Sequence, residues 1–284
     1  MPSKFRALPS LLHGTLVATH RDGCLGTAKS AAYSALLSFF PLLATIATIL
    51  VHVKADFVSR QLSGFLAEIL PPGTHHLVFH YFAVSGKQPF FIPVTGMLVS
   101  IWAASGAIVS LMEGFRAAYR IPAGRSFLHQ RAVALLLVLS AAIPTLAASI
   151  LILFGVGAER WLVQAVGLLP AGADLRGWVH VLGAATRYAI ALAAIGSGAA
   201  ILFRYGPNRP QRWSRVWPGA LLATVLWFAA TSLFGWYAGH VANYNVVYGS
   251  IARVILLLVW MYLLAVIALI GCEFNAQCEK EPGQ

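Results

Sequence analysis

A run without any charged side chain covers residues 216–252 and limits the possible folds more than any other feature of the sequence. As one helix it would be about 55 Å long, whereas the hydrocarbon core of a bilayer is about 30 Å thick. The run contains Gly239 and Asn243, which are typical of a turn. We therefore expect two helices, at about 216–238 and 249–275, which cross a membrane in opposite directions.

Four further stretches have the composition and length of a membrane-spanning helix, which takes roughly 20 apolar residues. They lie at about 30–53, 91–119, 132–158 and 178–203. Charged residues make up only 10% of the chain, against about 25% in soluble proteins, so most of its surface must face lipid. The sequence predicts an all-α integral membrane bundle of six transmembrane helices, forming one domain over 30–276.

The distribution of positive charge predicts the orientation of this bundle, because Lys and Arg collect on the cytoplasmic side of a membrane. Of the 20 Lys and Arg residues, thirteen fall on one side of the six predicted spans and five on the other. The richer side includes the N-terminal segment 1–29 and the tail 277–284. We therefore expect both termini in the cytoplasm. Cys24, Cys272 and Cys278 also fall there, as free thiols.

The longest connection, residues 54–90, carries apolar side chains at helical spacing and then Pro71-Pro72-Gly73. This pattern predicts an amphipathic helix in the first outer loop, lying on the membrane surface or covering the bundle. His75, His76 and His80 follow it. Two histidines and a carboxylate can bind zinc, but no carboxylate stands at a defined spacing here. We therefore expect interfacial histidines, no metal site and no cofactor.

Two arginines lie inside predicted spans, where a charge is costly and by default indicates function. Arg187 is expected near mid-membrane, and Arg253 in the outer part of the last span. No acidic residue in any predicted span matches their depth. The pair is therefore a candidate site for an anion such as a lipid phosphate. The alternative is structural: Arg253 extends to the membrane surface, and Arg187 bonds to helix carbonyls or to Asp174.

Four more charges lie near the expected cytoplasmic ends of the second and sixth spans. They are Glu113, Arg116, Arg120 and Glu273. The spacing of three residues allows Glu113 to pair with Arg116 on one helix face. We expect the Glu273 carboxylate to join the last span to Arg116 or Arg120, as a structural or coupling charge.

Three stretches carry a family resemblance. They are AYSALLSFFPLL at 32–43, YGPN at 205–208 followed by Trp213 and Pro218-Gly219-Ala220, and a closing segment with YGS at 248–250, WMY at 260–262 and GCEFNA at 271–276. In this order and spacing, the chain resembles the YihY/BrkB family of bacterial inner-membrane proteins, formerly labelled ribonuclease BN. The residues that match its motifs are Tyr33, Pro41, Pro207, Pro218, Gly219, Tyr248, Gly249, Trp260, Gly271, Glu273 and Asn275.

The resemblance implies a multi-pass protein of the bacterial inner membrane, linked to virulence through serum resistance and to envelope lipid or lipopolysaccharide export. It favours a transporter or flippase-like protein for an anionic phospholipid or a lipopolysaccharide precursor, with membrane lipids as partners and no nucleic acid. A non-transporting scaffold that docks envelope-assembly partners is the alternative, and a homo-oligomer is compatible with both.

Ribonuclease activity is the least expected function. Metal-dependent RNA cleavage needs a cluster of metal ligands, and the sequence contains no motif that supplies one. We therefore expect no enzyme. The sequence also has no ATP-binding motif, so transport would be passive, coupled to an ion or powered by a partner.

Overall fold

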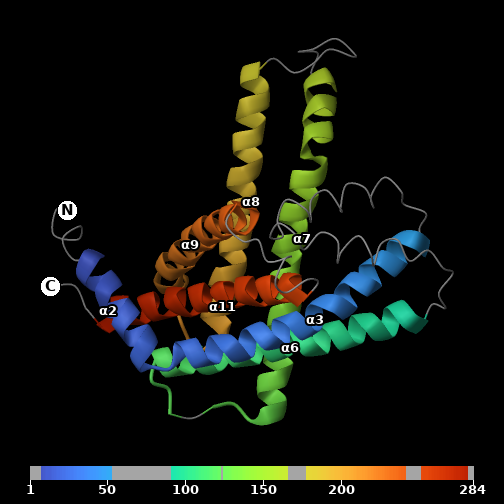
Figure 1. The fold of residues 1–284 in the computed structure, drawn as a ribbon. Helices are drawn as coiled ribbons and strands as arrows, with labels where there is room; N and C mark the ends of the chain where they lie inside the picture. The colour runs from blue at the N-terminus through green and yellow to red at the C-terminus, as the bar shows by residue number, and fades with distance from the viewer. Residues whose placement is uncertain (1–7, 53–90, 123, 166–176, 241–250, 281–284) are drawn as a thin grey trace.

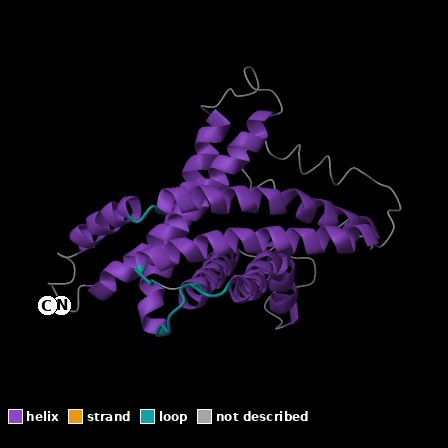
Figure 2. Ribbon diagram, turned by 90° about the horizontal axis from the view of Figure 1, so that it is seen from below, coloured by secondary structure: helices purple, strands orange, loops and turns teal. Residues whose placement is uncertain are grey.

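The computed structural model describes residues 8–52, 91–122, 124–165, 177–240 and 251–280, which contain seven helices and no strand (Figure 1). The helices are α2 (Leu8–Arg21), α3 (Cys24–His52), α6 (Phe91–Ala118), α7 (Phe127–Ala165), α8 (Gly177–Tyr205), α9 (Trp213–His240) and α11 (Ile251–Lys280). Figure 2 shows the same all-helical architecture from below, with short loops between the described helices.

Six of these helices, all except α2, are long and apolar enough to cross a membrane. Each overlaps one of the six predicted spans, so the prediction of an all-α bundle with six candidate membrane-spanning helices is confirmed. The amphipathic helix expected in the first outer loop lies outside the described residues, as do His75, His76 and His80.

The N-terminal helix α2 was not predicted. It ends at Arg21, and α3 begins at Cys24 after a sharp corner formed by Asp22 and Gly23. Gly23 has a φ of 71°, the left-handed conformation that commonly ends a helix and that glycine adopts at little cost. The helix α2, which precedes this corner, packs against α11, and its Thr15, Ala18 and Thr19 are buried.

Many hydroxyl groups inside the apolar helices donate a hydrogen bond to a carbonyl of their own helix. Thr45 donates to the carbonyl of Pro41 at 2.8 Å, and Ser100 donates to the carbonyl of Gly96 at 2.7 Å. An unpaired polar group costs several kcal/mol in a bilayer core, where water is absent. These internal bonds let serine and threonine stand in helices that contact lipid.

Large apolar side chains are exposed along every candidate span. They include Leu98 in α6, Leu136 in α7, Leu182 in α8, Val225 in α9 and Val259 in α11. In water such a surface would drive aggregation, whereas in a bilayer it contacts the lipid tails.

The largest hydrophobic core lies where one end of α3, α6, α8, α9 and α11 meet. It contains Cys24 and Ala28 of α3, Phe115 of α6, Phe203 of α8 and Val216 of α9. The rings of Phe115 and Phe203 pack edge to face, with centroids 5.6 Å apart. The first turns of α3 and α9 thus meet the last turns of α6, α8 and α11, as expected for spans that alternate in direction.

From this shared end the helices separate into pairs. In Figure 1, α3 and α6 lie side by side along one axis, and α7 and α8 form a second pair that crosses them. A smaller core of Leu43, Phe234, Leu256, Leu257 and Trp260 joins α3, α9 and α11 away from the shared end.

Most of the described lysines and arginines lie on the helix ends and loops that meet at the shared end. They are Arg21, Lys29, Arg116, Arg120, Arg125, Arg204, Arg209, Arg212, Arg215 and Lys280. The described acids there are Asp22, Glu113, Glu273 and Glu279. The main core and the main concentration of positive charge therefore coincide.

Candidate functional site

The side chain of Asn275 joins α11 to the first turns of α9. Its Oδ1 accepts a hydrogen bond from the backbone N–H of Gly219 at 2.7 Å, and its Nδ2 donates to the carbonyl of Val216 at 3.1 Å. Asn275 is fully buried, so both bonds are shielded from water. A buried amide with a partner for its donor and its acceptor fixes the position of one helix against the other.

Glycines permit this close approach of α9 and α11. A Cβ atom added at Gly219 would lie 2.0 Å from the carbonyl oxygen of Gly271, closer than any side chain can come. The structure thus brings together three residues that carried the family resemblance: Gly219, Gly271 and Asn275. The sequence identified them, but not the contact that joins them.

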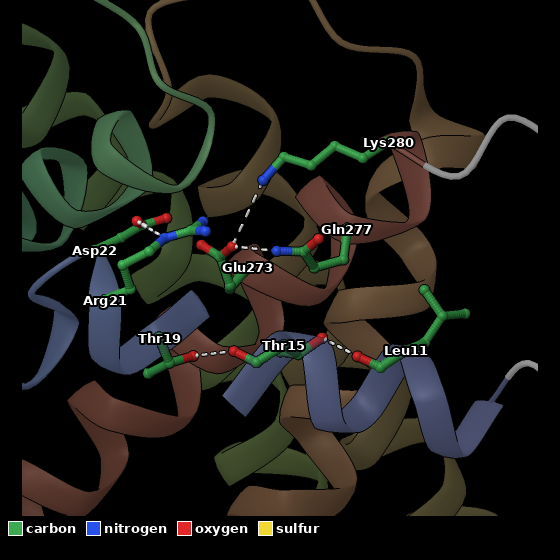
Figure 3. A network of polar contacts seen from close by, with 8 residues as sticks. All are labelled: Leu11, Thr15, Thr19, Arg21, Asp22, Glu273, Gln277 and Lys280. Atoms are coloured by element: carbon green, nitrogen blue, oxygen red, sulfur yellow. Dashed lines mark hydrogen bonds and ion pairs between the residues drawn. The ribbon is translucent and has the colours of Figure 1, made fainter. Parts of the chain in front are cut away.

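Glu273 is also fully buried, about two turns before α11 ends at Lys280. Its Oε1 accepts a hydrogen bond from Gln277 Nε2 at 2.9 Å and lies 4.0 Å from Lys280 Nζ (Figure 3). Arg21 and Asp22 form an ion pair beside it, at the end of α2. Asp22 raises the pKa of the Arg21 guanidinium through this hydrogen bond.

The expectation that Glu273 pairs with Arg116 or Arg120 is therefore wrong. Its described partners, Gln277 and Lys280, lie on its own helix, and Arg21 at the end of α2 lies beside it (Figure 3). Within the described ranges, no ion pair joins Glu113 to Arg116. Glu113 is exposed, and the Arg116 guanidinium lies against Gly124, where an added Cβ would be 2.7 Å from its Nη1.

A second polar network surrounds the loop between α8 and α9, which contains the YGPN motif. Arg125 donates to the carbonyls of Gly206 and Tyr205, both at 3.0 Å. Arg209 forms an ion pair with Glu279 of α11. These bonds fasten the loop, with buried Gly206 and Pro207, to the end of the bundle.

The end of α6 joins the same network. The ring of Tyr119 lies 4.4 Å beneath the Arg209 guanidinium, and its hydroxyl donates to Gln211 Oε1 at 3.4 Å. Burial raises the pKa of the Tyr119 phenol above its ordinary value, so the group remains a neutral donor. Sequence reasoning missed this network, although the YGPN motif marked the loop that it holds.

Arg187 lies in α8, and its side chain is only 9% exposed. The structure therefore places this guanidinium in the interior of the protein rather than among lipid tails. Arg253 lies in α11, but its side chain is outside the described residues, so the pairing of the two arginines remains a prediction.

The remaining motif residues have different positions. Trp260 is buried in the smaller core, whereas Tyr33 is 60% exposed on α3. Pro41 and Pro218 lie inside α3 and α9. Tyr248 and Gly249 are outside the described residues.

Among the residues that the structure describes, no group of three or more His, Cys, Asp or Glu side chains is arranged to hold a metal ion. The three cysteines are free, and Cys24 and Cys272 are buried.

Comparison with known proteins identifies the family. The family model described as virulence factor BrkB matches residues 15–283, nearly the whole chain. The chain belongs to the BrkB virulence factor family. The expected resemblance is thus confirmed, and both polar networks lie within the matched BrkB region.

Several relatives of this BrkB protein are membrane proteins or carry a ribonuclease-like name. The putative ribonuclease-like protein YfkH of Bacillus subtilis is 27% identical over 90% of this chain and 90% of its own length. A UPF0761 membrane protein of Tolumonas auensis is 26% identical over 86% of this chain and 77% of its own. Another, from Alkalilimnicola ehrlichii, is 27% identical over 90% of this chain but only 55% of its own. No solved structure matches the chain significantly. With six apolar helices and such relatives, it is a multi-pass membrane protein.

Proposed function

We propose that this BrkB-family protein handles an anionic lipid or envelope precursor in the bacterial inner membrane, as a transporter or flippase-like protein. The observation that carries this proposal is Arg187, a guanidinium with 9% exposure inside a helix that is apolar enough to cross the membrane. A positive charge held inside a membrane bundle is expensive, and proteins keep such charges mainly for function.

The chemistry of Arg187 selects the ligand class. A guanidinium binds phosphate through two parallel hydrogen bonds, and both bonds are stronger where water is scarce. Phospholipids and lipopolysaccharide precursors carry phosphate, and they reach a membrane protein from the bilayer itself. An anionic headgroup is therefore the ligand that suits a buried arginine in this location.

The architecture supports a bundle that is fastened at one end. The Asn275 hydrogen bonds and the Arg209–Glu279 ion pair hold the shared end together, while the two helix pairs diverge from it in Figure 1. A bundle of this kind can open and close around an internal charge while its fastened end stays in place. We place the fastened end in the cytoplasm, with both termini, because positive charge concentrates there.

We also propose that the protein is not a ribonuclease. The name of YfkH describes that relative, whereas the sequence of this chain contains no motif that supplies the metal ligands of RNA hydrolysis. Purified protein should leave a structured RNA uncut in magnesium or manganese. Cleavage that co-purifies with the chain and is lost in Glu273→Ala would contradict this.

The test of lipid handling is transbilayer movement in proteoliposomes. Vesicles with fluorescent phosphatidylglycerol should lose inner-leaflet label to an external quencher faster with the protein than without it, under an imposed proton or sodium gradient. Arg187→Ala should slow this movement, whereas Arg212→Gln, at an exposed cation in the α8–α9 loop, should not. Equal rates in protein-containing and protein-free vesicles under every gradient would contradict the proposal.

A further inference from the structure

The carboxyl group of Glu273 is only partly satisfied by its surroundings. Glu273 is 0% exposed, inside the candidate span Val254–Lys280. Its Oε1 accepts the hydrogen bond from Gln277, whereas Oε2 is buried and has no hydrogen-bond partner among the residues that the structure describes. An ionised carboxylate has about four sites for hydrogen bonds, and its burial without donors is strongly unfavourable. The neutral, protonated form of Glu273 suits this environment better.

The charges close to Glu273 do not replace the missing donors. Arg21 donates from Nε to Asp22 Oδ1 at 3.0 Å, so the Asp22 carboxylate balances its charge. Lys280 Nζ lies 4.0 Å from Oε1, and its side chain is 38% exposed, so water screens its charge. The negative charge of Asp22 opposes a second negative charge on Glu273. The neighbouring Cys272 adds a buried thiol.

Helices α3, α6 and α9 also pack against α11. From α3, the buried thiol of Cys24 faces the Glu273 carboxyl group. At the end of α6, the Arg116 guanidinium lies against the loop before α7. At the start of α9, Arg215 Nη1 lies 3.9 Å from Glu279. Within the described ranges, these helices therefore give Glu273 no ion pair.

Glu273 is buried, but it lies close to water at the shared end of the bundle. Lys280, with its nitrogen 4.0 Å from Oε1, is itself partly exposed, so the carboxyl group lies one side chain below the surface. Helix α2 covers α11 here, with Thr15 and Thr19 buried. Acidic residues in this situation, inside a span but within reach of water, are typical of proton relays in membrane proteins.

From this arrangement we propose that Glu273 is a proton-binding site, loaded from the shared end, and that it couples the proposed lipid movement to a proton gradient. The proton comes from water at that end. It forms an O–H bond with Oε2, and the carboxylate loses its negative charge. A proton needs no cavity, so the close packing around Glu273 is no obstacle. The coupling rests on the proposed function, whereas proton binding does not.

The direct test of proton binding is infrared spectroscopy of the purified protein, because a protonated carboxyl group has a carbonyl stretching band that an ionised one lacks. The wild type should show this band at neutral pH and lose it at alkaline pH. Glu273→Gln should lack the band, whereas Glu113→Gln, at an exposed acid in α6, should keep it. A wild type without the band at neutral pH, or a band that persists in Glu273→Gln, would overturn the proposal.

Melting temperatures in detergent give a second measurement that needs no lipid. A folded protein that holds a proton, which its unfolded chain releases, loses stability as the pH rises. The melting temperature of the wild type should therefore fall relative to that of Glu273→Gln between about pH 5 and pH 8, because the amide does not titrate. A difference between the two proteins that stays constant over this range would contradict proton binding.

Coupling is tested in the proteoliposomes described above. Reversing the proton gradient should change the rate of phosphatidylglycerol movement with the wild type and with Glu113→Gln, but not with Glu273→Gln. An equal response of Glu273→Gln and the wild type would overturn the coupling. If none of the proteins moves lipid, the proposed function fails, and the infrared and melting measurements alone decide whether Glu273 binds a proton.

Discussion

The backbone N–H of Gly219 in α9 donates a 2.7 Å hydrogen bond to the side-chain oxygen of Asn275 in α11. The bond forms because Gly219 and Gly271 allow the two helix backbones to touch. The amide returns a second bond to the carbonyl of Val216, so it spans nearly one turn of α9. The family motifs around Gly219 and around Asn275 are far apart in the sequence, but they contact each other directly in the folded protein.

Gly219→Ala should destabilise the protein strongly. The new methyl group would lie 2.0 Å from the carbonyl oxygen of Gly271 and 2.5 Å from Asn275 Nδ2, so the helices must separate and the amide bonds lengthen. Overpacking of this kind costs about 1–3 kcal/mol or more, before the loss of the hydrogen bonds is added. Thermal unfolding in detergent measures the change.

Gly235→Ala in the same helix is the matched control. A Cβ atom at Gly235 meets nothing within 4 Å, and alanine favours a helix over glycine by up to about 1 kcal/mol. This variant should melt at or above the wild-type temperature. If Gly219→Ala and Gly235→Ala have the same melting temperature, the contact between α9 and α11 does not determine stability.

Gln277→Ala should cost more stability than Lys280→Ala, although both residues contact Glu273. Gln277 donates the hydrogen bond to a fully buried carboxylate, and a buried acceptor left without a donor costs about 1–3 kcal/mol. Lys280 is 4.0 Å away with its side chain 38% exposed, so its loss should cost less than about 1 kcal/mol.

A double-mutant cycle checks that Gln277 acts through Glu273. In a Glu273→Met background the carboxylate is gone, and the cost of Gln277→Ala should largely disappear. An equal cost in both backgrounds would show that Gln277 stabilises α11 in some other way.

The six long helices could be predicted because membrane spans follow from one physical rule. A helix that crosses lipid needs about 20 mostly apolar residues, and each span has them, although Arg187 interrupts one span and Arg253 lies near the start of another. The short helix α2 lacks this signal. It contains apolar residues on more than one face, including Leu12, Leu16 and Val17, which are exposed, and its contact with α11 depends on the tertiary fold.

The candidate site was only partly predictable for a related reason. Depth along a helix can be counted from sequence, which is why Glu273 and Arg116 were expected to meet. Which face of a helix meets which neighbour depends on packing, and packing placed Glu273 beside Arg21 at the end of α2.

The membrane orientation can be checked with single cysteines in a Cys278→Ser background, where Cys24 and Cys272 are buried. A membrane-impermeant maleimide added to intact cells should modify Ser63→Cys in the first outer loop. It should not modify Arg212→Cys, which should react only after the cells are permeabilised. These results follow from the concentration of Lys and Arg at the end that includes Arg212. Labelling of Arg212→Cys from outside would invert the topology.

The most direct measurement of lipid handling is native mass spectrometry of the anionic lipids that stay bound after mild purification, compared between the wild type and two Arg187 variants. The wild type should retain a phosphate-bearing lipid. Arg187→Lys should keep the fold but retain less of it, because an ammonium lacks the paired donors of guanidinium, and Arg187→Ala should retain less still. Lys29→Ala, at an exposed cation on α3, should match the wild type. Wild-type lipid retention in both Arg187 variants would contradict the account and leave Arg187 as a structural charge.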